Sequence, residues 1–154
     1  MLEISTASGA ADLEQARALF REYVAEVDAP CCFATFAEEL ASLPGEYASP
    51  AGRLFLARSG GSVAGCVALR PLGESCEMKR LYVRKPFRSS GLGRELARNV
   101  IAAAREQRYG SVFLDTLPSM LEAIALYRSL GFRERGPYAA QPTPGALYFE
   151  LRLS

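Results

Sequence analysis

Histidine is absent from the 154-residue chain. Without an imidazole, the Ser-His-Asp and Cys-His nucleophile arrangements and every His-containing metal site are excluded. The cysteines also lack the spacing of a zinc site or a disulfide framework, because Cys31 and Cys32 are adjacent and Cys66 and Cys76 stand alone. We therefore expect no metal, and reduced thiols of the kind found in a cytoplasm.

Long apolar runs and targeting signals are lacking as well. No apolar run approaches the 18 residues that a membrane-spanning helix needs. The first fifteen residues contain neither a basic region nor an apolar stretch of the kind that opens a signal peptide. We expect a cytoplasmic protein that makes no contact with a membrane.

The composition is that of an ordinary folded domain, with 49% apolar and 23% charged residues. A chain of this length is typical of one domain, and we expect residues 1–154 to form a single domain. The formal net charge of +1 counts against binding to nucleic acid.

The charges are nevertheless distributed unevenly. Residues 1–52 contain nine acidic side chains and two arginines, a net charge of −7, whereas residues 76–108 contain nine basic and three acidic side chains, a net charge of +6. The basic segment predicts an anionic ligand near residues 76–108.

Hydrophobic periodicity and turn residues predict ten elements in the order β-α-α-β-β-β-α-β-α-β. A strand–helix–strand run at 76–115 requires a parallel pair with a right-handed crossover. We expect an α/β (α+β) fold with a mixed, mostly antiparallel sheet and helices on both faces. In the strand at 76–83, simple alternation places Met78 and Arg80 on one face and Lys79, Leu81 and Val83 on the other. The predicted strands are 2–5, 54–57, 63–69, 76–83, 112–115 and 146–153, and the predicted helices are 11–27, 33–43, 92–107 and 120–130.

A basic turn with two glycines joins the strand at 76–83 to the following helix. Backbone N–H groups at such a helix start, together with the helix dipole, bind anions such as phosphate. The sequence departs from a dinucleotide-binding fingerprint, and Gly93-Arg94-Glu95 departs from a Walker A loop. From the glycines alone, a plain strand–helix turn with capping serines is the alternative.

Two motifs in register resemble a known family. Arg88-x-x-Gly91-x-Gly93, after a strand ending Leu81-Tyr82-Val83, resembles the pyrophosphate-binding motif of the GNAT superfamily of acyl-CoA N-acyltransferases. The segment at 123–132, AIALYRSLGF, resembles the helix-plus-Gly-Phe signature of that superfamily. The motifs cover residues 76–135, and the predicted element order matches over the whole chain. The resemblance implies a GNAT-type sheet with a central splayed parallel pair.

The resemblance also implies an acetyl-CoA-dependent N-acetyltransferase that acts on a primary amine of a small molecule, without a covalent enzyme intermediate. One departure concerns Met120, where the family often has an asparagine that binds the pantetheine arm. The amide contact is therefore absent or replaced by Ser119 or Thr116. The residues implied to bind the cofactor are Leu81, Tyr82, Val83, Arg88, Ser89, Ser90, Gly91, Leu92, Gly93, Arg94, Thr116 and Tyr127.

Acyl transfer to an ammonium group needs a base for the amine and an acid for the leaving thiolate. The resemblance places Tyr127 near the thioester sulfur as the acid, and the alternative for Tyr127 is a core aromatic residue. Glu77 is the predicted base, and Glu74 or a water molecule is the alternative base. If Glu77 has no catalytic role, we expect it to face solvent in an ion pair with Lys79 or an arginine. We expect Cys66 and Cys76 to be buried, and Asp115 to hold a loop rather than to take part in catalysis.

The acceptor site of the resembled fold would comprise residues 27–36 and 137–145. The acidic N-terminal third could attract a cationic amine, or Lys79 and Arg80 could hold a carboxylate on an amino-acid-like acceptor, and the sequence leaves this choice open. Homodimers are common in the family, and the sequence leaves a homodimer open. A CoA-binding sensor or interaction module without transferase activity is the alternative function.

Overall fold

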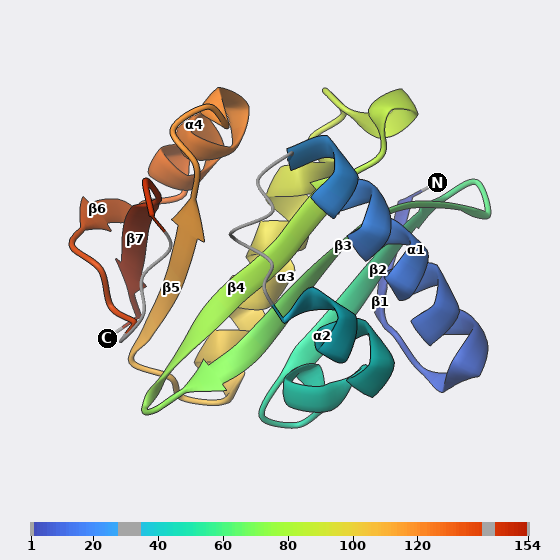
Figure 1. Cartoon of the computed structure of the whole chain (residues 1–154), viewed down its shortest axis with the longest axis horizontal. Coiled ribbons are helices and arrows are strands. Elements are labelled where there is room, and N and C mark those ends of the chain that lie inside the picture. Colours follow the sequence, from blue (N-terminus) through green and yellow to red (C-terminus); the bar gives the residue numbers. More distant parts are fainter. Residues whose placement is uncertain (1, 28–34, 140–143, 154) are drawn as a thin grey trace.

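The computed structural model describes residues 2–27, 35–139 and 144–153. Cys31, Cys32 and parts of both predicted acceptor segments lie outside these ranges. Seven strands form a single sheet in the order β1-β2-β3-β4-β5-β7-β6 (Figure 1). The strands are β1 (Leu2–Thr6), β2 (Arg53–Ser59), β3 (Ser62–Leu72), β4 (Ser75–Val83), β5 (Ser111–Thr116), β6 (Arg133–Arg135) and β7 (Leu147–Arg152).

All neighbouring strands are antiparallel except β4 and β5, which are parallel. The parallel pair is in register at only two positions, Cys76 opposite Val112 and Glu77 opposite Phe113. Beyond these pairs the two strands diverge towards their carboxyl ends, as Figure 1 shows. The predicted mixed, mostly antiparallel sheet with a splayed parallel pair is confirmed.

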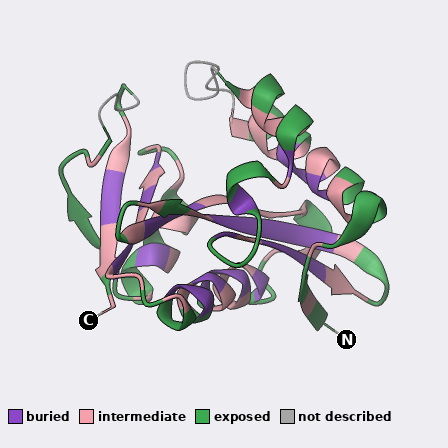
Figure 2. Cartoon of the chain, turned by 90° about the horizontal axis from the view of Figure 1, so that it is seen from below, coloured by how far each residue is buried: buried purple, intermediate pink, exposed green. Residues whose placement is uncertain are grey.

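Helices cover both faces of the sheet (Figures 1 and 2). On one face, α1 packs through Ala16, Leu19 and Phe20 against Leu56 and buried neighbours in β3. On the other face, the amphipathic α3 places its buried side chains in the larger core cluster, which α4 joins through Tyr127. No helix in the described ranges is long and apolar enough to cross a membrane. The helices are α1 (Gly9–Val27), α2 (Phe36–Ser42), α3 (Leu92–Glu106) and α4 (Leu121–Ser129), with 3₁₀ turns η2 (Gly45–Tyr47) and η3 (Lys85–Phe87).

A β-bulge in β4 overturns the predicted alternation of its side chains. The pairing with β3 shifts between Cys66 and Ala68, and Arg80 adopts a left-handed φ of 60°. Because the extra residue interrupts the period of two, Lys79 and Arg80 face the α1–α2 side together. Leu81 instead joins Met78 in the core on the α3 side. The prediction that Met78 and Arg80 share a face was therefore wrong.

Strand β6 was also absent from the predicted elements. Its three residues are all exposed, and their sequence, Arg-Glu-Arg, has no apolar alternation. The strand forms because it pairs with the edge of β7. A local sequence pattern carries no signal for an edge strand of this kind.

Beside the bulge, β3 and β4 pack closely at Gly65. This residue of β3 pairs with Val83 of β4. A Cβ atom at Gly65 would lie 2.6 Å from the Tyr82 carbonyl oxygen and 3.3 Å from the Leu96 side chain. Both neighbours belong to packed elements, so the backbone of β4 would have to move.

We expect Gly65→Ala to lower the free energy of unfolding by about 2 kcal/mol, because backbone atoms cannot yield to the added methyl group. Urea denaturation followed by circular dichroism measures this. Gly136→Ala is the matched control, since a Cβ there meets no atom within 4 Å, and should change stability little. Equal stability of the two variants would contradict the packing argument.

Candidate active site

A cleft of about 870 Å³ lies where the end of β4 meets α1, α3 and α4. Its lining includes ten of the twelve residues predicted to bind a cofactor. The strand residues Leu81, Tyr82 and Val83 form one wall, and the glycine turn forms another. The predicted residues that line the cleft are Leu81, Tyr82, Val83, Arg88, Ser89, Gly91, Leu92, Gly93, Arg94 and Tyr127.

The amino-terminal end of α3 opens onto this cleft. Gly91 precedes the helix in a left-handed conformation with φ 84°, which glycine adopts without strain. The first intrahelical bond runs from the Glu95 N–H to the Gly91 carbonyl, so the N–H groups of Leu92, Gly93 and Arg94 have no acceptor in the helix. The Gly91 position offers no side chain to cap this end. These donors, with the helix dipole, suit a phosphate group.

Two predicted cofactor residues lie off the cleft. Ser90 donates its hydroxyl to the Phe87 carbonyl at 2.6 Å and so holds the turn together. Thr116 is 7% exposed and donates its hydroxyl to the Met120 sulfur at 3.4 Å. Met120 itself lines the cleft, together with Ser119. The position where the family often has asparagine thus presents a thioether whose sulfur contacts Thr116.

Three of the nine basic side chains at residues 76–108 pair with carboxylates of the acidic segment, residues 1–52. Arg84 pairs with Glu22 of α1 at 2.7 Å, and Arg88 pairs with Glu26 at 2.8 Å. The Arg84 guanidinium holds the pKa of Glu22 below its usual value. These pairs fasten α1 to the end of β4, so they build the wall of the cleft. The anionic ligand expected near residues 76–108 stays a prediction, and these three pairs give part of the basic segment a structural role.

Arg94 differs from these arginines. Its guanidinium lines the cleft and donates to the Ser129 hydroxyl at 2.7 Å, which is a neutral partner. In the described part of the chain it forms no ion pair. Its charge is therefore available to an anionic group at the start of α3.

Tyr127 lies at the inner end of the cleft, on α4. Its side chain packs against the rings of Phe132 and Phe149, at centroid distances of 5.9 and 6.4 Å. Burial raises the pKa of the phenol above its usual value, so the hydroxyl keeps its proton at neutral pH. Tyr127 thus belongs to the core and also lines the cleft. Its position is compatible with both expectations from the sequence, a core aromatic residue and an acid near the thioester.

Glu77 lies on the opposite face of the sheet, at the last position of β4 that pairs with β5. Only 3% of this residue is exposed. One carboxylate oxygen accepts a bond from Arg70 at 2.6 Å, and the other accepts a bond from the Tyr138 hydroxyl at 2.5 Å. The Tyr138 ring stacks on Phe113 of β5 at a centroid distance of 4.8 Å. Glu77 is therefore buried and paired, not solvent-facing, and both of its oxygens are engaged.

Glu74, the alternative base, lies in the exposed turn that precedes β4. The cleft lies at the opposite end of this strand, beside residues 81–83. The structure therefore separates Glu74 from the cleft by the length of β4.

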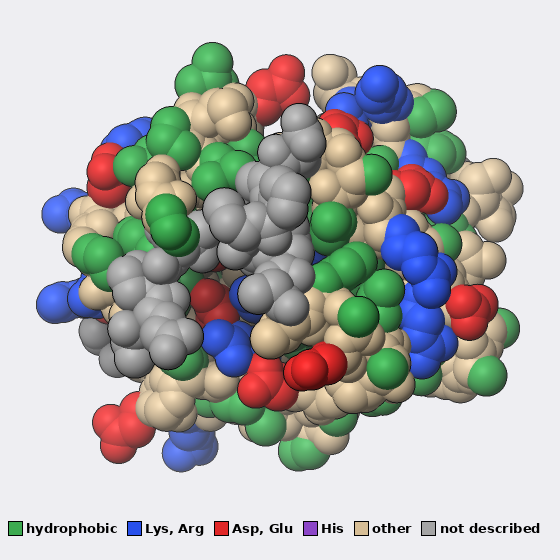
Figure 3. Space-filling view, viewed as in Figure 1, with side chains coloured by type: hydrophobic (Ala, Val, Ile, Leu, Met, Phe, Trp, Pro, Cys, Tyr) green, Lys and Arg blue, Asp and Glu red, His purple; other side chains and the backbone are tan. Residues whose placement is uncertain are grey.

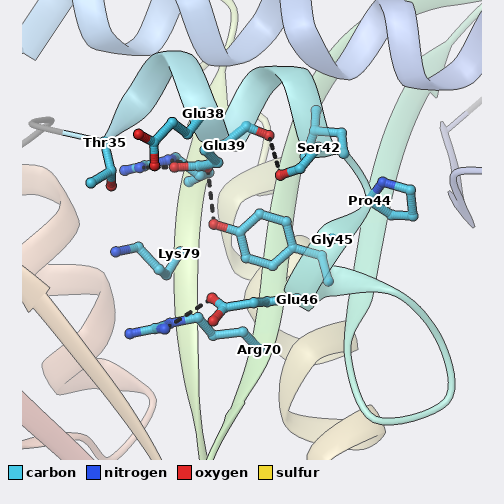
Figure 4. Close-up of a pocket in the computed structure, with 12 residues that line it drawn as sticks. Thr35, Glu38, Glu39, Ser42, Pro44, Gly45, Glu46, Arg70 and Lys79 are labelled. Carbon is cyan, nitrogen blue, oxygen red and sulfur yellow. Dashed lines mark hydrogen bonds and ion pairs between the residues drawn. The ribbon is translucent and has the colours of Figure 1, made fainter.

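A second, smaller pocket of about 330 Å³ lies beneath α2 on the same face as Glu77. Two ion pairs flank it, Arg80 with Glu39 at 2.5 Å and Arg70 with Glu46 at 2.9 Å. Figure 4 shows Lys79 between Glu39 and Arg70. Acidic and basic side chains are interspersed on this face (Figure 3).

Cys66 and Cys76 are both buried and free. Burial raises the pKa of both thiols, that of Cys76 to about 12, so neither is a thiolate at neutral pH. Among the residues that the structure describes, no three His, Cys, Asp or Glu side chains cluster as a metal site would require.

Sequence reasoning missed the contribution of α1 to the cleft. Tyr23, Glu26 and Val27 line it, although they lie more than fifty residues from the glycine turn. The only signal in the sequence was the opposite charge of the two segments. Tyr138 fell within a predicted acceptor loop, but its bond to Glu77 joins residues 61 positions apart and has no local pattern.

Comparison with known sequences gives one family. Residues 13–132 match the acetyltransferase (GNAT) family. The chain is 37% identical to an uncharacterised N-acetyltransferase of Schizosaccharomyces pombe, over 99% of this chain and 96% of that protein. It is 35% identical to an IAA acetyltransferase of Azospirillum brasilense, over 69% of this chain and 71% of that protein.

Solved structures share the fold. A GNAT-family acetyltransferase from Staphylococcus aureus superposes with a TM-score of 0.82 at 19% identity, with 100% of both chains covered. A putative streptothricin acetyltransferase from Bacillus anthracis, solved in complex with acetyl coenzyme A, has a TM-score of 0.63 at 20% identity over 73% of this chain and 69% of that chain.

The buried contacts of Glu77 predict a structural cost for its loss. We expect Glu77→Gln to lower the free energy of unfolding by about 2 kcal/mol, because the charged bond to Arg70 is lost in a buried site while Glu46 still compensates Arg70. Urea denaturation measures the change. The control is Glu95→Gln, which removes an exposed pair with Arg98 and should cost less than about 0.5 kcal/mol. A Glu77 variant as stable as this control would rule out the structural role.

Proposed function

The chain belongs to the GNAT acetyltransferase family and is an acyltransferase, and we propose that it transfers the acetyl group of acetyl-CoA to a primary amine of a small molecule. The amine attacks the thioester directly, without a covalent enzyme intermediate. Residues 1–154 act as one catalytic domain in this proposal. The cytoplasmic location stays a prediction, and the homodimer stays open.

The observation that carries the proposal is the open start of α3. Three N–H groups without helical acceptors and the Arg94 guanidinium meet on a cleft that is roughly the size of a small-molecule site. This donor set fits a pyrophosphate, since main-chain N–H groups and an arginine both bind phosphate oxygens. The residues that would hold it are Ser89, Gly91, Leu92, Gly93 and Arg94.

The bulged end of β4 supports the placement of the acyl arm. Leu81, Tyr82 and Val83 line the cleft beside the point where β4 leaves β5. Their backbone groups on that side lack a strand partner from β5, so they can bond to an extended amide-containing arm. One N–H here would donate to the thioester oxygen as charge develops on it.

Tyr127 is the proposed general acid. The phenol lies in the cleft wall and keeps its proton because burial raises its pKa. A protonated phenol can donate to a departing thiolate while remaining neutral at rest. The base role predicted for Glu77 has weaker support, because both carboxylate oxygens are already bonded to Arg70 and Tyr138.

The first test concerns the N–H groups at the start of α3. We expect Gly91→Glu to raise the acetyl-CoA dissociation constant at least tenfold. The new carboxylate would stand beside the N–H groups proposed to bind phosphate, and the two negative charges repel each other. Isothermal titration calorimetry measures the constant.

Gly73→Glu is the matched control for this variant. Gly73 also has a positive φ, 62°, and open space around it, but it lies in the turn between β3 and β4. It therefore shares the backbone strain and the added charge, and should leave acetyl-CoA binding unchanged. Unaltered binding in both variants would remove the glycine turn from the phosphate site.

The second test concerns the acid. Tyr127→Phe should lower kcat by about 100-fold and change the KM for acetyl-CoA little, because only the proton donor is lost. Steady-state release of free CoA thiol measures both constants. Tyr109→Phe is the control, since the Tyr109 hydroxyl bonds to the Ala51 carbonyl away from the cleft. A turnover rate equal to that of the parent would assign Tyr127 to packing alone. Binding of acetyl-CoA without turnover of any amine would instead favour the sensor or interaction module.

A further inference from the structure

Two residues of opposite charge stand at matching positions on the diverging strands. Glu77 and Phe113 form the last parallel pair, and both contact Tyr138 on the α2 side of the sheet. Lys79 and Asp115 each lie two residues further along their strands. Because side chains of a strand alternate, these two occupy the same face as Glu77 and Phe113, one step into the splay.

Lys79 and Asp115 interact without touching. The charge of Lys79 acts on the Asp115 carboxyl, yet no ion pair joins the two groups within the described residues. Paired strands lie about 4.8 Å apart, and these strands diverge beyond residues 77 and 113, which holds the two charged groups apart. A gap between a cation and an anion is the complement of a small zwitterion.

The neighbouring charges are already engaged. Arg80 pairs with Glu39, and Arg70 pairs with both Glu46 and Glu77. Lys79, in contrast, lines the pocket beneath α2 and forms no ion pair in the described ranges. The charges of Lys79, Glu77 and Arg80 act on Asp115. The charge of Asp115 in turn acts on the phenols of Tyr127 and Tyr138.

We propose that the acceptor is an α-amino acid, whose carboxylate binds Lys79 and whose ammonium group binds Asp115, the general base. This inference rests on the proposed acetyl transfer and specifies its acceptor. It decides between the two acceptor classes that the sequence left open. An α-amino acid fits because its two charged groups are attached to one carbon, and the cation and anion here stand on neighbouring strands.

Asp115 takes one proton from the ammonium group and later releases it to solvent. The amine nitrogen then forms a bond to the thioester carbonyl carbon, and the carbon–sulfur bond breaks. Tyr127 gives its proton to the thiolate and regains one that the nitrogen loses, through water. One hydrogen stays on the amide nitrogen of the product.

Two properties of Asp115 suit this role. Burial raises the pKa of its carboxyl above the usual value, which brings its basicity closer to that needed at neutral pH. The charge of Asp115 also acts on Tyr127, the proposed acid, which lines the cleft. The sequence-based expectation that Asp115 only holds a loop is replaced in this proposal.

Amino acids and their amides, compared as acceptors, test whether the enzyme recognises the carboxylate. Thiol release from acetyl-CoA is measured with L-leucine, L-phenylalanine and the other proteinogenic amino acids, and with the matching amino acid amides. The amide keeps the shape and has a less basic amine, so more of it is the free nucleophile at neutral pH. We expect kcat/KM to favour at least one free acid over its amide by tenfold or more.

Substitutions then show whether Lys79 causes the preference for the free acid over the amide. Lys79→Met should raise the KM for the preferred amino acid at least tenfold, abolish the preference for acid over amide, and leave acetyl-CoA binding intact. Lys79→Arg should retain part of the preference. Lys85→Met is the matched control, because it removes the other lysine of the chain, which is exposed in η3.

Asp115→Asn tests the base. We expect kcat to fall 100-fold or more with acetyl-CoA affinity unchanged. The remaining rate should rise with pH as the free amine fraction rises, because the amine then needs no base. A variant that only disturbed the structure would keep the pH profile of the parent protein at a lower rate.

The outcomes separate the two proposals. Amides or simple amines used as well as the acids would overturn the amino-acid acceptor and leave acetyl transfer intact. A preference for acids that survives Lys79→Met, or full activity of Asp115→Asn, would overturn the assigned residues. No thiol release with any amine, peptide amines included, would overturn both the acceptor and the proposed function.

Discussion

Two pairs of residues hold β4 and β5 together, and beyond them the strands separate in the middle of the sheet. A central gap is costly, since buried backbone groups that lose a strand partner must bond to something else. In the proposed function, both faces of the sheet take part at this gap. The cleft proposed for acetyl-CoA opens beside α3 and α4, and a charged pocket opens beside α2. The proposed transfer between a donor on one face and an acceptor on the other requires such a passage.

Charge pairing supports this architecture. Arginines in and just after β4 bond to carboxylates of α1 and α2, across 41 to 62 residues of sequence. The pairs position the first helices over the end of β4. Arg80 and Arg84 each form two bonds to one carboxylate, which fixes the geometry of these pairs. The acidic third and the basic segment of the chain are thus two halves of one interface.

Much of the fold could be predicted from the sequence. Periodicity located the four helices and every strand except β6 close to their observed bounds, and the motif around Gly91 and Gly93 lines the cleft proposed to bind acetyl-CoA. The bulge at Arg80 could not be predicted, because it arises from pairing with β3 and reverses the alternation that sequence reasoning assumes. The partners of Glu77 were equally hidden, since Arg70 and Tyr138 reach it from other elements. The position of Asp115 was hidden for the same reason, because its place two residues beyond Phe113, on the face shared with Lys79, depends on the register of β4 and β5.

The pairing of the two charged segments also affects how a ligand approaches. A net charge of +1, with many opposite charges neutralised locally, leaves a weak electric field at a distance from the surface. A polyanionic cosubstrate is then not guided from afar, and its encounter rate depends little on ionic strength. In the proposed function, its recognition occurs at short range, at the N–H groups that open α3.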